Sequence, residues 1–252
     1  MRPASTLARI TFAAAMLAGS LPTRAQGFTP GEETVFTVSY LAVPTGEGRI
    51  RVGNAEGDIW PVILQARTSG AASLLDIREH MVAYWDTARR LSRGSDLQAY
   101  EVGDFHKDSA RFDSTGRQLT VVEQRHDRAD RTVLDVPDGS LDLAGAFMWL
   151  RLQNLEVGRE YRIPVVGGTT QFVLLASVLA LEPVRTPAGD FPSFKIRLTL
   201  GFDGKFSTKR DTFLWLSETG AHHLVKASAD FAVGSVVAEL KSYHPGGQVA
   251  VK

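Results

Sequence analysis

The feature that most constrains this chain is an apolar–polar alternation with a period of two residues, which begins near Glu33 and recurs almost to the C-terminus. In the segment 36–40, for example, large apolar residues alternate with Thr37 and Ser39. Successive side chains of a β-strand point to opposite faces, so this pattern is typical of strands with one buried and one solvated face. Such strands belong mainly to antiparallel sheets. The alternation therefore predicts a mainly β chain.

Turn residues separate these strands. Pro164 has no backbone N–H, which predicts that its strand lies at a sheet edge or carries a bulge. Turns are expected where Gly, Asn, Asp and Ser cluster, at 45–48, 54–57, 113–116, 167–168, 203–204 and 217–220. The clearest predicted strands are Tyr161–Val166 with Thr170–Leu181, Phe191–Phe202 with Thr208–Leu216, and Ala221–Ala229 with Ala232–Tyr243.

One segment departs from this period. Between Leu141 and Leu155, apolar residues recur at helical spacing around nearly the whole circumference. Ser140 is positioned as the N-cap, Asp142 lies in the first turn, and Gly158 follows the end. A helix that is apolar on all sides needs burial on several sides, which a curved sheet provides. The expected fold is an antiparallel, curved sheet or partly closed β-barrel or half-barrel packed around one central helix.

The first 25 residues have the three parts of a cleavable secretory signal. Arg2 and Arg9 supply positive charge, an apolar run follows at 10–21, and Thr23–Ala25 offers small residues to the peptidase. The apolar run is too short to span a bilayer, which takes about 20 residues. We therefore predict a signal peptide at 1–25 and a single β-rich domain at 26–252, which is exported to the periplasm and does not span the membrane after cleavage.

The residue composition limits the cellular compartments and the classes of partner that are possible for this protein. The chain has no cysteine, which rules out disulfides, thiolate metal sites and the lipid-modified cysteine of a bacterial lipoprotein. Cleavage of the signal removes three arginines and no acidic residue, leaving 25 basic against 28 acidic residues. A mildly acidic domain lacks the clustered positive charge that displaces counterions from nucleic acids. We expect a soluble periplasmic protein that is not a lipoprotein and has no nucleic-acid partner.

Short turn and packing motifs occur along the whole mature chain. They are Phe28 with Gly31-Glu32, Gly46 to Gly48, the segment Asp142 to Arg151 followed by Gly158 and Tyr161, Thr186 to Phe191, and Trp215 to Ser217. In order and content these motifs resemble the bacterial exported family of unknown function DUF3108, with a looser match at 75–131. The resemblance implies an antiparallel, partly closed β structure in the periplasm, similar to the half-barrels that carry lipoproteins or lipids. A likeness of fold does not by itself establish function.

The sequence lacks the motifs of several enzyme classes. Neither Ser140 nor Ser235 sits in a G-x-S-x-G frame, and no P-loop, dinucleotide-binding glycine turn or H-E-x-x-H motif occurs. His222 and His223 are the one adjacent pair among six histidines. On a strand their rings would point to opposite faces and could not bind one ion, so we expect a surface pair near a turn. We predict no catalytic residue, no metal site and no cofactor.

Aromatic side chains are the remaining candidates for a binding site. A lipid or another apolar ligand would be held by such side chains if they lined a concave sheet. The same residues would equally serve to fill an ordinary core, and the sequence leaves both interpretations open. The candidates for an apolar ligand pocket are Trp60, Trp85, Phe147, Trp149, Leu150 and Trp215.

Three functions compete. The leading hypothesis is a non-enzymatic periplasmic protein that binds or carries an apolar or amphipathic envelope ligand between its curved sheet and its central helix. The alternative is a structural or adaptor protein of the cell envelope that contacts a protein partner, for example through an exposed strand edge. The third is a hydrolase of envelope polymers that uses carboxylates such as Asp76, Glu79 or Glu123, because paired carboxylates need only a suitable separation in space.

Overall fold

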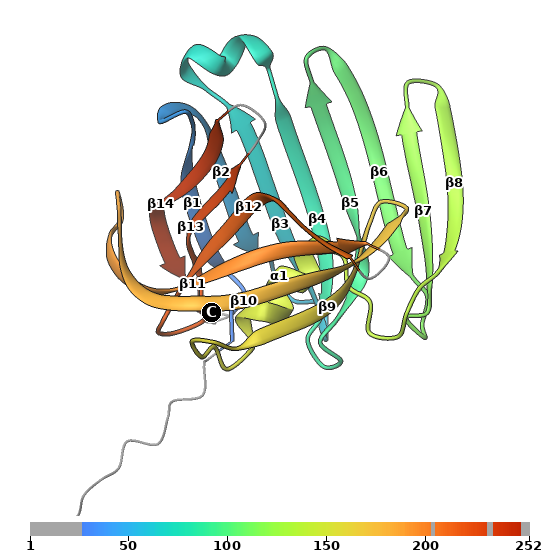
Figure 1. Ribbon diagram of the computed structural model, residues 1–252. Helices are drawn as coiled ribbons and strands as arrows, with labels where there is room; N and C mark the ends of the chain where they lie inside the picture. The colour runs from blue at the N-terminus through green and yellow to red at the C-terminus, as the bar shows by residue number, and fades with distance from the viewer. Residues whose placement is uncertain (1–26, 203–204, 231–233, 248–252) are drawn as a thin grey trace, which may run out of the picture.

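The chain forms one large antiparallel sheet that bends around an α-helix, which confirms the expected fold class (Figure 1). The computed structural model describes residues 27–202, 205–230 and 234–247, so the predicted signal peptide lies outside the described residues. The helical elements are the 3₁₀ turn η1 (Gly70–Leu75) and α1 (Leu143–Arg151). The strands are β1 (Glu32–Tyr40), β2 (Val43–Val52), β3 (Ile59–Thr68), β4 (Arg78–Asp86), β5 (Leu91–Glu101), β6 (Asp104–Phe112), β7 (Gln118–Arg125), β8 (Arg128–Asp135), β9 (Glu160–Gly167), β10 (Thr170–Thr186), β11 (Gly189–Phe202), β12 (Lys205–Ser217), β13 (Leu224–Asp230) and β14 (Ser235–Pro245).

The sheet consists of two antiparallel meanders, which are joined where the first and the last strand of the chain pair with each other. Strands β1 to β8 form one meander, β9 to β14 form the other, and α1 connects them. Strand β14 pairs with β1, from Glu32 opposite Pro245 to Tyr40 opposite Val236. This pairing brings the first and last strands together in the middle of the sheet, and it leaves β8 and β9 as the two edges.

Irregular pairing accompanies the curvature of the sheet. The register shifts between Val35 and Phe36 in β1, between Tyr84 and Trp85 in β4, and after Val178 in β10. An extra residue on one strand bends that strand and increases its local twist. In Figure 1, β10 to β12 cross in front of β3 and β4, with α1 between them. Because β8 and β9 do not pair with each other, the sheet stays open.

Pro164 lies on edge strand β9, as predicted. Its carbonyl oxygen accepts a hydrogen bond from the backbone N–H of Leu141 at 3.0 Å, and the carbonyl of Leu141 accepts one from Val166 at 2.8 Å. The residue that leads into α1 therefore occupies part of the free edge of β9. Within the described residues, β8 has β7 as its single partner strand.

Some predicted strand boundaries are wrong. The glycines at 45–48 lie inside β2, and the chain turns instead at Leu41 and Ala42, whose φ angles are 50° and 63°. A Cβ at Gly46 would lie 2.6 Å from the carbonyl oxygen of Arg67, so this glycine permits a close strand approach rather than a turn. Strand β13 begins at Leu224, three residues later than expected. The turn predicted at 203–204 lies outside the described residues.

Helix α1 begins later and ends earlier than its apolar pattern indicated. Its N-cap is Asp142 and not Ser140, because the Asp142 Oδ1 atom accepts a hydrogen bond from the Gly145 N–H at 2.6 Å. The same oxygen accepts one from the Ser92 hydroxyl of β5 at 3.0 Å, which ties the start of the helix to the sheet. Leu155 is buried beyond the end of the helix, so its spacing reflects burial in the core and not helical structure.

The main core lies between α1 and the surrounding sheet. The helix contacts β4, β5 and β9. Side chains exposed by 3% or less come from both layers, and examples are Val62, Ala83, Trp85, Met148 and Leu150. None of the helices in the described part of the chain is long and apolar enough to cross a membrane.

Candidate ligand-binding surface

Three of the predicted pocket residues lie on α1. Leu150 is buried, whereas Phe147 and Trp149 are half-buried at the margin of the core. The Trp149 ring packs edge-to-face on Tyr161 of β9, with 6.0 Å between ring centroids. Leu150 is therefore a core residue in this structure, and Phe147 and Trp149 retain solvent-accessible surface.

Two further predicted residues, Trp60 and Trp85, lie directly opposite each other on β3 and β4 and face the helix. Trp85 is buried, and its indole N–H has no hydrogen-bond partner among the described residues. Trp60 is half-buried and packs edge-to-face against Phe28, with 6.0 Å between centroids. Trp85 is thus a member of the main core, and Trp60 packs against it.

Trp215 does not join the other candidates. Its neighbour Leu216 packs in the main core, so the Trp215 side chain points to the opposite face of β12. There it packs with Val184 and Val225 in a separate small cluster, and its indole N–H donates to Glu182 at 2.7 Å. The structure thus places five of the six predicted residues in or against the core between the helix and the sheet, and it places Trp215 on the other side of the sheet.

Beyond the helix, the core continues as a partly accessible apolar surface on the same face of the sheet. Met81 shows the pattern: it is half-buried and lies two residues from buried Ala83, so both point to the helix side of β4. Equivalent half-buried residues on both halves of the sheet pack against the core. We define the inner apolar surface as Ile50, Leu64, Met81, Leu198, Leu214 and Ala238.

Polar side chains follow the apolar ones along the same face. Glu79 lies two residues before Met81 on β4 and therefore on the same face of the sheet. Its carboxyl forms a hydrogen bond with Glu101 of β5. Burial raises the pKa of Glu79, and the neighbouring Glu101 carboxyl raises this pKa further. His106 and Asp108 of β6 carry the polar row across the sheet. The inner face therefore runs from apolar near the helix to polar and acidic toward the strand ends.

The three carboxylates proposed for a hydrolase do not form one cluster around Glu79. Asp76 is the left-handed C-cap of η1, and its carboxylate forms an ion pair with Arg78 at 3.0 Å. Glu123 of β7 lies opposite Asp108 in the sheet register. The carboxyl that the structure places next to Glu79 is that of Glu101, which the sequence patterns did not single out.

A buried ion pair holds the helix to the sheet. Arg151, in the last turn of α1, donates from Nη2 to Glu32 Oε1 of β1 at 2.6 Å, and the two side chains are 2% and 4% exposed. Its Nε group also donates to the carbonyl oxygens of Ala221 and His222, both at 3.1 Å. The guanidinium lies 5.2 Å from the ring centroid of Phe28. One side chain thus connects α1, β1 and the loop before β13.

The expectation of a surface histidine pair is wrong. His222 and His223 lie in the loop before β13 and are each 6% exposed. His223 stacks on Tyr243 with 3.8 Å between centroids and forms a hydrogen bond with the Ser217 hydroxyl at 3.0 Å. Burial lowers the pKa of both histidines, to about 4 for His223. They are neutral packing residues at pH 7, and no group of three potential metal ligands occurs in the described residues.

Sequence reasoning passed over Glu32 and Arg151 as a pair, although a signal was present. Arg151 is a charged residue in an otherwise apolar segment, and a charge is buried only when it is paired. The partner could not be identified from spacing, because 119 positions separate the two residues.

The fold and this surface define a class of protein: an open, barrel-like antiparallel sheet with a helix inside it and an accessible apolar inner face. A family model matches residues 35–241, and the chain belongs to that family, described as a protein of unknown function, DUF3108. The expected family is therefore confirmed. None of the functionally curated proteins matches the sequence.

Solved structures extend the likeness of fold. A β-barrel-like protein of the domain of unknown function DUF1849 from Brucella abortus has a TM-score of 0.60 and 7% identity, and the match covers 88% of this chain and 100% of that one. A protein of YmcC-like fold from Bacteroides fragilis has a TM-score of 0.34 and 12% identity, with 87% and 98% coverage. At these identities the first likeness concerns the fold alone, and the second supports no further argument.

Proposed function

We propose that this protein is a non-enzymatic, exported binding protein that holds an apolar or amphipathic envelope ligand against its inner apolar surface. The observation that carries the proposal is that Leu64 and Met81 on one half of the sheet, and Leu198 and Leu214 on the other, stay half-buried on the helix-facing side of the sheet. A contiguous accessible apolar surface often marks a binding site. Export to the periplasm rests on the N-terminal signal pattern at 1–25.

The polarity of the inner face suggests how such a ligand would lie. An acyl chain or similar apolar group would pack beside Met81 and the half-buried Phe147 and Trp149 of the helix. The polar end would reach Glu79 and His106, where carboxyl and imidazole groups can accept or donate hydrogen bonds. The arrangement favours an amphiphile with hydrogen-bond donors or positive charge in its head group.

Adjacent residues of β4 provide a matched test. Met81 and Val82 are both half-buried, but Met81 faces the helix side and Val82 the opposite side. We expect Met81→Glu to weaken binding of the neutral fluorophore N-phenyl-1-naphthylamine by about tenfold or more, because the variant places a charge on the apolar surface. Val82→Glu should bind like the wild type, and thermal unfolding should show that both variants fold.

Native mass spectrometry of protein purified from the periplasm supplies a second measurement. The expected result is a copurified amphiphile that is retained by Val82→Glu and lost by Met81→Glu. Equal binding by the two variants, or a wild type that binds neither the fluorophore nor a copurified molecule, would reject the proposal.

A second candidate function, an adaptor that contacts an envelope protein, is favoured by the free edge of β8. This strand pairs with β7 through Arg128–Asp135 and has no partner strand on its other side within the described residues. Unpaired N–H and C=O groups of an edge can accept an additional strand. Crosslinking in cells from a photoreactive residue at Ala129 should then recover one stoichiometric protein, and recovery of none would reject the adaptor function.

A further inference from the structure

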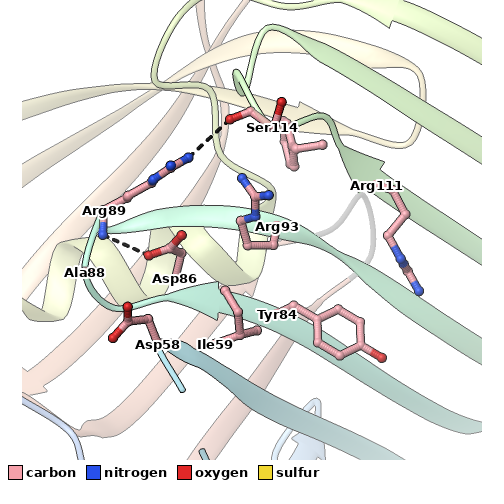
Figure 2. A pocket seen from close by; sticks show the side chains of 10 residues that line it. Asp58, Ile59, Tyr84, Asp86, Ala88, Arg89, Arg93, Arg111 and Ser114 are labelled. Atoms are coloured by element: carbon pink, nitrogen blue, oxygen red, sulfur yellow. Dashed lines mark hydrogen bonds between the residues drawn. The ribbon is translucent and has the colours of Figure 1, made fainter. Parts of the chain in front are cut away.

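A hollow of about 710 Å³ lies on the face of the sheet that points away from α1 (Figure 2). Tyr84 lines it and lies between Ala83 and Trp85, which pack in the main core, so the Tyr84 ring points to the outer face. The remaining lining comes from the start of β3, the end of β4 and the β4–β5 turn, Arg93 of β5, and the end of β6 with its following turn. This volume is within the range of about 300–1,000 Å³ typical of small-molecule sites.

One wall of the hollow is held by a fixed polar arrangement. Arg111 of β6 donates two hydrogen bonds from Nη2 to the carboxylate of Asp96, at 2.6 and 2.7 Å. The Tyr84 hydroxyl donates to the same carboxylate at 2.9 Å, and the Arg111 guanidinium lies 5.1 Å from the Tyr84 ring centroid. Arg111 is therefore already neutralised, and with Tyr84 it forms one side of the hollow.

Two other arginines lack such a partner. Arg89 donates from Nη1 to the Ser114 carbonyl oxygen at 3.2 Å, and Arg93 donates from Nη1 to the Asp113 carbonyl oxygen at 3.5 Å. Among the described residues, neither guanidinium has a carboxylate oxygen within 4.0 Å. Figure 2 shows both side chains reaching from the β4–β5 hairpin toward the turn that carries Ser114. Each guanidinium keeps N–H donors for another group.

Carboxylates order both the turn that carries Arg89 and the turn whose carbonyl oxygens accept hydrogen bonds from Arg89 and Arg93. Asp113 accepts hydrogen bonds from the backbone N–H groups of Arg117 and Gln118 and from the Thr115 hydroxyl, and these bonds lower the pKa of Asp113 to about 2. Asp86 accepts one from the Arg89 backbone N–H at 2.8 Å. Because the Asp113 carboxylate is engaged in its own turn, it does not neutralise the nearby arginines.

The rest of the lining is mixed. Ile59 and Ala88 add apolar surface beside the Tyr84 ring. Asp58 and Asp86 contribute carboxylates for which no ion pair occurs in the described part of the chain, and both oppose any anion that enters. The charge arrangement thus predicts that neutralising an arginine weakens the binding of an anion and that neutralising Asp58 strengthens it.

We propose that this hollow is a binding site for a small organic anion, whose phosphate or carboxylate oxygens are held by Arg89 and Arg93 while its apolar part lies against Ile59 and Tyr84. Guanidinium groups present planar pairs of N–H donors that match the oxygens of such anions. The site is on the opposite face of the sheet from the inner apolar surface, so it is independent of the function proposed for that surface.

Isothermal titration calorimetry of the full mature chain with phenyl phosphate tests the site, because this probe carries both a phosphate and an apolar ring. We expect saturable one-to-one binding that Arg93→Gln and Arg89→Gln each weaken about tenfold, the effect of losing a charge-assisted hydrogen bond. Asp58→Asn should tighten binding by a few fold. Arg90→Gln is the matched control, because Arg90 lies in the same exposed turn but does not line the hollow.

Vesicles of phosphatidylcholine with and without phosphatidylglycerol identify the source of the anion. Binding to phosphatidylglycerol vesicles with the same variant pattern assigns the site to a lipid head group, and binding of phenyl phosphate alone assigns it to a soluble anion. Both results support an oxyanion site. The proposal would be overturned if the protein bound neither phenyl phosphate nor the phosphatidylglycerol vesicles. It would also be overturned if Arg90→Gln weakened binding as much as Arg93→Gln does. Met81→Glu should leave phenyl phosphate binding unchanged, which separates this test from that of the inner surface.

Discussion

Replacing Arg151 by methionine tests how the helix is anchored to the sheet. Methionine keeps much of the aliphatic stem but removes the ion pair with Glu32 and the hydrogen bonds to the carbonyl oxygens of Ala221 and His222. Glu32 then remains buried without its cation, and its Oε2 atom already has no partner among the described residues. The substitution affects three segments of the chain at once.

The expected cost follows from burial. Removing one partner of a buried ion pair costs about 3–5 kcal/mol, because the other charge stays desolvated. The matched control is Arg49, whose Nη1 lies 2.6 Å from Glu33 Oε1, the same separation as in the buried pair, but whose side chain is 42% exposed. Exposed pairs contribute about 0–1 kcal/mol, so Arg49→Met should have a far smaller effect on the free energy of unfolding.

The effect of Arg151→Met should also depend on pH. Burial raises the pKa of Glu32 above 4.5, and Arg151 opposes this rise, so the variant should raise the pKa further. A carboxyl with a raised pKa in the folded state contributes stability that is present below its unfolded pKa and lost as pH rises through the folded pKa. The variant should therefore lose more stability, relative to the wild type, at pH 7 than at pH 5.

Urea unfolding followed by tryptophan fluorescence measures these differences, with Glu32→Gln and the double variant completing a cycle. Residues in contact couple by about 0.5–3 kcal/mol, so the double variant should cost less than the sum of the single changes. A cost for Arg151→Met no greater than that for Arg49→Met, or one that is equal at pH 5 and pH 7, would refute the reasoning.

Three further changes test the helix start and the sheet. Burial raises the pKa of Asp142 from 3.8 to about 6, so the stabilising contribution of this carboxyl is present below pH 3.8 and lost as pH rises through 6. Asp142→Asn does not titrate, so between pH 4 and pH 7 its free energy of unfolding, measured by urea unfolding, should rise relative to that of the wild type by up to about 3 kcal/mol. Gly145→Ala should lower Tm in calorimetry, although such a change normally stabilises a helix by about 1 kcal/mol, because its Cβ would lie 1.9 Å from the Ser92 hydroxyl. Gly94→Ala should destabilise by about 2 kcal/mol or more in thermal unfolding, since Gly94 has a φ of +129° and a Cβ there would lie 2.0 Å from the Ala110 carbonyl oxygen. An unchanged or higher Tm for either glycine variant would contradict these close approaches.

Local features of the sequence were predicted well where a local physical rule governs them. The alternation beginning near Glu33 marks strands because side-chain direction reverses at each residue, and Pro164 marks an edge because it lacks a donor. The helix was located by its spacing, but its boundaries were not. Asp142 is the cap because Ser92, a residue 50 positions away, supports its carboxylate.

The residues of the binding surfaces were predicted less well, because their position depends on strand register and on the bend of the sheet. Trp215 and Leu216 are neighbours in sequence, yet they face opposite sides of β12. The outer hollow combines Ile59, Arg93 and Arg111 from three strands, and no spacing in the sequence indicates that they converge.

The sequence by itself determined the antiparallel strands, the apolar helix, the lack of cysteine and the family to which the chain belongs. The tertiary structure alone decided that Glu32 and Arg151 meet in the core, that His222 and His223 are buried, and which face carries each candidate surface. The physical reason is that a period of two distinguishes two faces of a strand but not which face is enclosed. That choice is made when β14 pairs with β1 and the bent sheet surrounds the helix.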